Sequence, residues 1–205
     1  MTEEEARAWV RDRFGVSRET QCAQFIKLLS EESERQNLVS RATLSEAWTR
    51  HIVDSAQLLT VTDVPDGLWV DIGSGAGLPG IVIAILREQA ILLVEPRRRR
   101  VEFLEATARE LNLSQVRVAL SRVEAVPATP KAAVISARAV AALPSLLANA
   151  QHLSDEKTLW LLPKGRTAQS EVDAARASWQ GVFHVKPSLT EPGSGIVVAR
   201  GVAIR

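Results

Sequence analysis

Residues 70–80 read Val-Asp-Ile-Gly-Ser-Gly-Ala-Gly-Leu-Pro-Gly, a glycine-rich stretch that follows a short apolar segment at 68–72. Glycines at alternate positions, Gly73, Gly75 and Gly77, permit a tight turn with no Cβ atoms in the way, so a ligand can lie against bare backbone. In open parallel sheets, ligands bind at the carboxyl ends of the strands. The stretch therefore predicts a strand, a ligand-binding turn and a helix, which together begin an α/β fold.

Downstream of this turn, short apolar segments alternate with helical patterns. We expect strands at 68–72, 91–95, 116–120, 132–137, 158–162, 183–189 and 196–202, and helices at 78–87, 97–112, 143–152 and 167–179. This alternation predicts a mainly parallel sheet with helices on both faces. The turn at 191–195 is too short for a parallel crossover, so one of the last two strands must run antiparallel. Five parallel strands and a closing hairpin, seven strands in all, are the layout of Rossmann-like class I methyltransferases.

Residues 1–66 show helical patterns only, and we expect them to form a helical extension to a Rossmann-like domain at 67–205. Ser17 can cap a helix that runs to about Gln36. The sequence Thr43-Leu-Ser-Glu46 fits a capping box and predicts a further helix from there to about Leu59.

The composition is that of an ordinary globular protein. The 205 residues suit one domain with a small extension, and 46% are hydrophobic and 24% charged. The single cysteine, Cys22, excludes an internal disulfide. Apolar stretches reach about ten residues, against the roughly 20 that a membrane span needs, so we expect a cytoplasmic protein. The net charge is +1, but residues 1–66 hold 8 basic and 12 acidic residues, so the excess of basic residues lies in the remainder of the chain.

Two cofactors fit the glycine-rich turn. Residues 75–80 match the nicotinamide-dinucleotide pattern G-x-G-x-x-G, and Glu95 follows about 20 residues later. A strand that ends in D-x-G-x-G-x-G, as at Asp71, is instead typical of S-adenosylmethionine pockets. There Asp71 would help place the methionine part and Glu95 would bind the ribose hydroxyls, although a buried Asp71 could equally be a structural partner of the turn. Motif and strand order together favour S-adenosylmethionine over a nicotinamide cofactor.

Further segments of the chain are similar to one family. They are Asn37-Leu-Val-Ser40, Arg50-His-Ile-Val-Asp-Ser55, Arg99-Arg-Val-Glu-Phe-Leu104, Ser121-Arg-Val-Glu124, Ser136-Ala-Arg-Ala-Val140 and Pro163-Lys-Gly165. With the glycine-rich turn, they resemble the bacterial small-subunit rRNA guanine-N7 methyltransferase family, RsmG or GidB (glucose-inhibited division protein B). The glycine-rich turn alone indicates only the class of methyltransferase. The Arg-His-x-x-Asp-Ser segment and the Leu-Pro-Gly at the end of the turn make the resemblance specific to this family. Two positions depart from it: Val39 replaces the usual Thr, and Glu95-Pro-Arg97 replaces Asp-Ser-Leu.

The resemblance implies an S-adenosylmethionine-dependent enzyme that methylates guanine N7 in 16S rRNA, in a loop near the decoding site. Its partner would be the rRNA or a precursor of the small ribosomal subunit, and its second product S-adenosylhomocysteine. The residues that it implies as cofactor contacts are Gly73, Leu78, Val123, Glu124 and Arg138. We expect the enzyme to be a monomer without a membrane segment.

Basic residues gather near the expected carboxyl ends of strands. The run Arg97–Arg100 opens a helix, where cations oppose the helix dipole and phosphate would offset that cost, although a solvated surface explains them equally well. RNA would then lie over this rim of the sheet. The residues expected to contact it are Arg50, His51, Arg98, Arg99, Arg100, Arg122, Lys164 and Arg166.

The sequence contains few candidates for acid–base chemistry. Guanine N7 carries a lone pair and no proton, so methyl transfer to it needs correct positioning and no general base. His51 is a weak catalytic candidate, and it lies one turn from Asp54, with which it could simply pair. No metal-binding spacing is present. Two alternatives stay open: a methyltransferase acting on another RNA or a small molecule, and a non-catalytic RNA-associated Rossmann module.

Overall fold

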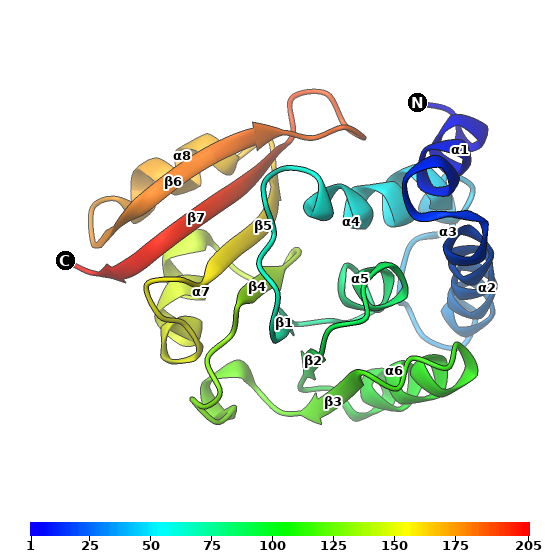
Figure 1. Ribbon diagram of the computed structural model, residues 1–205, viewed down its shortest axis with the longest axis horizontal. Helices are drawn as coiled ribbons and strands as arrows, with labels where there is room; N and C mark the ends of the chain where they lie inside the picture. Colours follow the sequence, from blue (N-terminus) through cyan, green and yellow to red (C-terminus); the bar gives the residue numbers. More distant parts are fainter.

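The computed structural model describes residues 1–205 and contains one seven-stranded sheet in the order β3-β2-β1-β4-β5-β7-β6 (Figure 1). The strands are β1 Trp69–Ile72, β2 Ile91–Glu95, β3 Val116–Leu120, β4 Val134–Ala137, β5 Leu159–Gly165, β6 Trp179–Pro187 and β7 Gly195–Ile204. The pairs among β1 to β5 are parallel, and β7 runs antiparallel to both β5 and β6. The expected mainly parallel sheet with an antiparallel closing strand is therefore confirmed.

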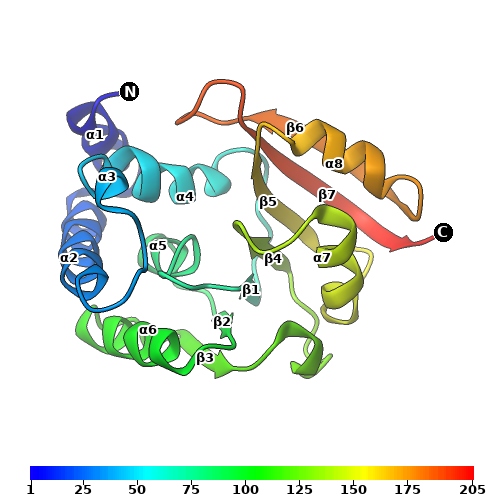
Figure 2. The same cartoon turned by 180° about the vertical axis from the view of Figure 1, so that it is seen from behind.

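Helices cover both faces of the sheet (Figures 1 and 2). Helices α7 (Leu143–Ala150) and α8 (Ala168–Ala175) lie on one face, and α5 (Gly80–Leu86) and α6 (Arg98–Glu110) lie on the other. Side chains of the strands alternate between two hydrophobic clusters, as the two-residue period of a strand requires. In β5, Leu161 joins the cluster that contains α5, whereas its neighbour Leu162 joins the cluster that contains α7 and α8.

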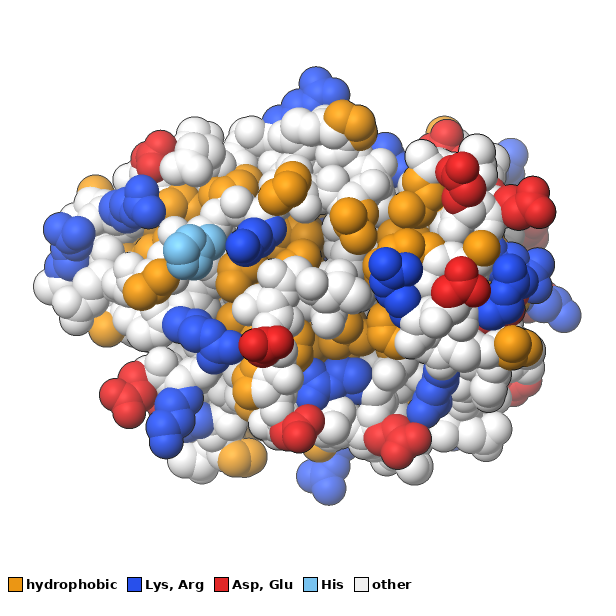
Figure 3. All heavy atoms as spheres, turned by 45° about the horizontal axis from the view of Figure 1, so that its top comes forward, with side chains coloured by type: hydrophobic (Ala, Val, Ile, Leu, Met, Phe, Trp, Pro, Cys, Tyr) orange, Lys and Arg blue, Asp and Glu red, His pale blue; other side chains and the backbone are white.

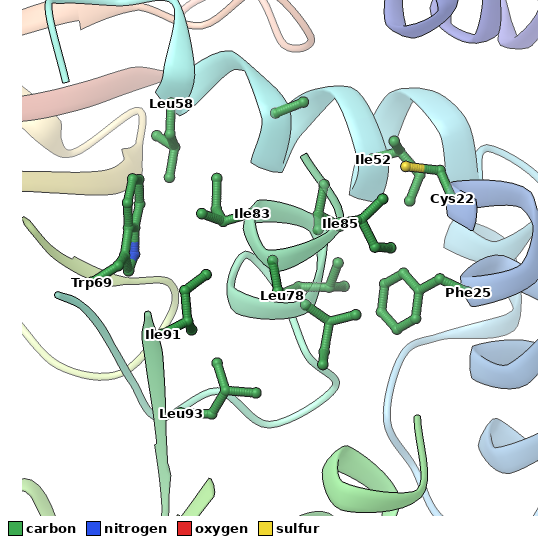
Figure 4. Close-up of a cluster of buried hydrophobic side chains, with 14 of the residues drawn as sticks. Cys22, Phe25, Ile52, Leu58, Trp69, Leu78, Ile83, Ile85, Ile91 and Leu93 are labelled. Atoms are coloured by element: carbon green, nitrogen blue, oxygen red, sulfur yellow. The ribbon is translucent and has the colours of Figure 1, made fainter. Parts of the chain in front are cut away.

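The N-terminal helices cover the same side of the sheet: α1 and α2 lie outside α5 and α6, and α4 lies beside α5 (Figure 1). They are α1 (Glu3–Phe14), α2 (Val16–Ser33), α3 (Arg41–Leu44), a π-helix at Trp48–Val53, α4 (Asp54–Ala56) and a 3-10 turn at Gln57–Leu59. Phe25 of α2 and Ile52 of the π-helix belong to the same buried cluster as Ile85 of α5 (Figure 4). Residues 1–66 therefore share one core with the sheet. None of the helices is long and apolar enough to cross a membrane.

The structure corrects some local expectations. Thr43 does not cap a helix; instead Ser40 caps α3 and accepts a hydrogen bond from the Thr43 N–H at 3.2 Å. The helix expected at 167–179 ends at Ala175, and Trp179 begins β6 opposite Ile204 of β7. Trp179 is buried in the core next to α8, so tertiary packing decides its conformation.

Candidate functional site

The glycine-rich turn is held in place by a buried carboxylate, that of Asp71 in β1. Its Oδ1 accepts a hydrogen bond from Ser136 Oγ at 2.6 Å, and its Oδ2 accepts one from the Gly80 N–H at 3.2 Å. Ser136 Oγ in turn accepts a hydrogen bond from Trp69 Nε1. Asp71 is fully buried, and this burial raises its pKa to about 6. These hydrogen bonds give Asp71 a structural role in the turn.

Two glycines of the turn lie where no side chain fits. A Cβ on Gly80 would lie 2.3 Å from Leu93 Cδ2 and 2.7 Å from Asp71 Oδ2, so α5 can approach the sheet only with a glycine there. Gly73 has φ +66°, and a Cβ there would lie 2.6 Å from Val140 Cγ2. The turn thus brings bare backbone against the segment that follows β4.

Glu95, at the end of β2, spans the turn and the loop before α6. Its Oε2 accepts a hydrogen bond from the Gly75 N–H at 3.0 Å, and its Oε1 accepts one from the Arg97 N–H at 2.9 Å. Each carboxylate oxygen keeps a second lone pair, which a diol could use. The loop Glu95–Arg97 is therefore fixed by its own carboxylate.

A cleft of about 310 Å³ lies at the carboxyl ends of β1, β2 and β3. Its lining residues are Ile72, Gly73, Val94, Glu95, Pro96, Arg97, Arg100, Ser121, Arg122, Val123, Glu124, Ala139, Val140 and Asn149. Among the expected cofactor residues, the cleft brings together Gly73, Glu95, Val123 and Glu124. The remaining expected residues of the turn do not line it. Asp71 is enclosed, and the Gly75 N–H donates to Glu95. A Cβ on Gly77 would meet Ile81 and Phe25, and the Leu78 side chain belongs to the core in Figure 4.

A second, larger cavity of about 610 Å³ adjoins the cleft, because Ala139 and Val140 line both. It lies beyond β4, between the ends of β5 and β7 and the N-terminal helices. Arg138, expected at the cofactor, lines this cavity. Its Nη1 lies 3.1 Å from Asp54 Oδ2 and donates to the Arg50 carbonyl at 3.3 Å.

The wall of the larger cavity joins the N-terminal segment to the β6–β7 loop. Asp54 Oδ1 accepts hydrogen bonds from Gln57 Nε2 and from Thr190 Oγ1, both at 2.9 Å. Gln57 Oε1 accepts one from the Leu189 N–H at 2.8 Å. Arg50 Nη1 lies 3.5 Å from Glu191 Oε2. Two segments far apart in the sequence therefore enclose one space beside the cleft.

A family model described as "rRNA small subunit methyltransferase G", GidB, matches residues 18–192. The chain belongs to this family. A ribosomal RNA small subunit methyltransferase G of Novosphingobium aromaticivorans is 49% identical over 99% of this chain and 90% of the relative, and one of Rhizorhabdus wittichii is 46% identical over 100% and 95%.

Solved structures with the same fold are distant in sequence. A methyltransferase from Geobacter sulfurreducens has a TM-score of 0.59 at 11% identity, covering 86% of this chain and 88% of that one. A putative S-adenosyl-L-methionine-dependent methyltransferase from Methanococcus maripaludis has a TM-score of 0.58 at 12% identity, covering 85% and 91%. These likenesses show that this member of the GidB family has the class I methyltransferase fold.

His51 of this family member lies in the π-helix and is buried, with no hydrogen-bond partner for either ring nitrogen. Burial, helped by the positive charge of Arg138, lowers its pKa to about 4. The expected pairing with Asp54 is wrong, because that carboxylate is taken up by Arg138, Gln57 and Thr190. At neutral pH, His51 is an uncharged, enclosed ring.

The basic residues expected at RNA differ in exposure. Arg50 and Arg100 are half-buried, and Arg100 lines the cofactor cleft. Arg98, Arg99, Arg122 and Arg166 are exposed. Lys164 is not: its side chain is 8% exposed, and its Nζ binds Glu171 Oε2 at 3.0 Å and the Ala141 carbonyl. The surface turned to the viewer in Figure 3 mixes basic, acidic and apolar side chains, as the small net charge leads one to expect.

Some residues that line the two spaces are not among the site residues that the sequence predicts. Val140 and Ala139 directly follow β4, so the rule for strand ends could have indicated them. Asn149 comes from α7, and Glu191 and Ser188 come from the β6–β7 loop. Their places depend on how distant elements pack together.

Proposed function

We propose that this chain transfers a methyl group from S-adenosylmethionine to N7 of a guanine in the 16S rRNA of the small ribosomal subunit. The observation that carries the proposal is the pair of joined spaces, a cleft beside Glu95 and a larger cavity that share Val140 and Ala139. One space suits a nucleoside cofactor and the other a flipped-out base. The names of relatives 46–49% identical over nearly the whole chain support the substrate class.

The residues of the cleft fit the cofactor. Gly73 lines the cleft with backbone alone, beside Val140, and the Glu95 oxygens keep lone pairs for ribose hydroxyls. Val123 and Glu124 follow β3, at the place where this fold binds an adenine edge. When bound, S-adenosylmethionine supplies an electrophilic methyl group.

The proposed chemistry asks the protein for position rather than for proton transfer. Because N7 has a free lone pair, the chain has to hold the base with N7 in line with the methyl carbon. His51 fits this account, since it is buried and its low pKa leaves it neutral. We assign no catalytic acid or base.

Exposed arginines would guide RNA to the site. Arg122 is exposed at the cleft, and Arg98 and Arg99 are exposed in the first turn of α6. Arg50 contacts Glu191, which lines the larger cavity. Residues 1–66 would then act as a helical extension of the domain at 67–205 and would wall the base cavity. We propose that the enzyme acts as a monomer. A ribosomal substrate, in a loop near the decoding site as the family resemblance implies, places the enzyme in the cytoplasm.

Calorimetry with S-adenosylhomocysteine and with a nicotinamide dinucleotide tests the cofactor, and methylation of unmodified small subunits tests the substrate. We expect binding of S-adenosylhomocysteine alone, and transfer to rRNA. The variant Glu95→Ala should lose binding while remaining folded. Binding without transfer to rRNA would favour another substrate, and no binding of S-adenosylhomocysteine would refute the proposal.

A further inference from the structure

The proposed reaction does not explain how guanine is chosen. Adenine also carries an N7 with a free lone pair, so nucleophilicity alone does not separate the two purines. They differ on the opposite, Watson–Crick edge: guanine presents two donors, N1–H and the N2 amino group, whereas adenine N1 is an acceptor and adenine has no N2 amino group. A group that reads this edge must lie in the larger cavity, away from the cofactor cleft.

Three carboxylates line the larger cavity, and two of them are already occupied. Asp54 binds Arg138, Gln57 and Thr190. Glu171 binds Lys164 Nζ at 3.0 Å, and it also accepts hydrogen bonds from the Leu143 N–H and from Thr167 Oγ1.

Glu191 differs from both. Its side chain is 41% exposed, and its one ionic contact is with Arg50 Nη1 at 3.5 Å. At that distance the contact is too long for a good hydrogen bond. The Glu191 oxygens are therefore free to accept hydrogen bonds from a ligand in the cavity.

We propose that the Glu191 carboxylate selects guanine by accepting hydrogen bonds from its N1–H and N2 amino group. This inference rests on the proposed function. A carboxylate offers two adjacent acceptors, which match two adjacent donors. The same carboxylate would face the lone pair of adenine N1 and repel it.

The topology places Glu191 on the correct side of the base. The cofactor cleft and the larger cavity meet at Val140, which follows β4. In the sheet order, β5 and then β7 and β6 follow β4, so the β6–β7 loop lies beyond β5 as seen from the cleft. With N7 directed toward the cleft, the Watson–Crick edge points toward this loop.

Hydrogen bonds to the N-terminal segment hold the β6–β7 loop in place without a ligand. The residues directly before Glu191 are tied to the N-terminal segment, Leu189 through Gln57 and Thr190 through Asp54. A group held in this way loses less conformational entropy when it binds. Asp54 and Gln57 of the N-terminal segment would therefore contribute to base selection, because they hold the loop that carries Glu191.

The test compares Glu191→Ala with the unaltered chain on two RNAs, one with guanine and one with inosine at the target position. Inosine retains N7 and N1–H and lacks the N2 amino group. We expect inosine to lower kcat/KM about 10-fold for the unaltered chain, and Glu191→Ala to lower kcat/KM on guanine by about 10- to 100-fold. On Glu191→Ala, inosine should cost almost nothing further. Glu191→Gln, which retains one acceptor and adds a donor, should resemble Glu191→Ala.

The matched control is Glu156→Ala. Glu156 is exposed and precedes the first residue of β5, at the end of the strand away from the larger cavity. This substitution should leave both rates and the inosine penalty unchanged. Calorimetry with S-adenosylhomocysteine should give the same affinity for every variant, which shows that each one is folded. An equal inosine penalty with and without Glu191 would overturn the proposal while guanine methylation still stands. A failure of the unaltered chain to methylate guanine N7 would instead refute the proposed function, and this inference with it.

Discussion

Replacing Gly73 by alanine perturbs the junction of the two spaces with a single methyl group. Gly73 has φ +66°, a left-handed conformation that costs an L-residue about 1–2 kcal/mol. The added Cβ would also lie 2.6 Å from Val140 Cγ2, so Val140 has to move. Val140 is 44% exposed and lines the cleft, so its displacement changes the shape of the space that the cofactor would occupy. We expect Gly73→Ala to lower the free energy of unfolding by about 1–2 kcal/mol and the affinity for S-adenosylhomocysteine by about 10-fold or more.

A second substitution separates the two effects. With Val140→Ala in the same chain, the nearest remaining side-chain atom of residue 140 is its Cβ, 3.7 Å away, which is ordinary contact. The double variant should regain most of the affinity of Val140→Ala alone, while the loss of stability due to φ persists. Denaturant unfolding and calorimetry measure the two quantities. If the double variant binds S-adenosylhomocysteine no better than Gly73→Ala does, the contact with Val140 is not the cause of the lost affinity, and this explanation is refuted.

Three further predictions concern titration and RNA. Burial raises the pKa of Asp71 from 3.8 to about 6. The protonated side chain therefore stabilises the fold below pH 3.8, and this contribution, about 3 kcal/mol, is lost as the pH rises through 6. In denaturant unfolding, Asp71→Asn should remove this dependence of the free energy of unfolding on pH. The pKa of His51 is lowered from 6.5 to about 4, so stability present above pH 6.5 is lost toward pH 4, and His51→Phe should remove that loss. A chain with Arg98→Glu and Arg99→Glu should bind RNA more weakly, with a smaller salt dependence, and keep its affinity for S-adenosylhomocysteine.

The sequence predicted the features that local chemistry decides. The glycine spacing after Ile72 indicated the turn, and the alternation of strands and helices indicated the order of the elements. The short turn at 191–195 required the antiparallel last strand, which β7 confirms. Each of these depends on neighbours within a few residues, so a single sequence contains the necessary information.

The sequence could not predict contacts between distant segments. Leu189 meets Gln57, and Thr190 meets Asp54, across 132 and 136 residues. For that reason the sequence around Glu191 indicates only a turn. The sequence also predicts Lys164 at RNA, whereas in the structure Glu171 binds it. Trp179 likewise leaves its helical pattern because the core takes up its side chain.

The central claim is methyl transfer from S-adenosylmethionine to guanine N7 of small-subunit rRNA. It is tested most directly by incubating the protein with methyl-labelled S-adenosylmethionine and small subunits that lack the modification, then identifying the labelled nucleoside by chromatography after complete digestion of the RNA. We predict that the label appears in 7-methylguanosine and in no other nucleoside. Label in another nucleoside, or no label in the rRNA, would contradict the account.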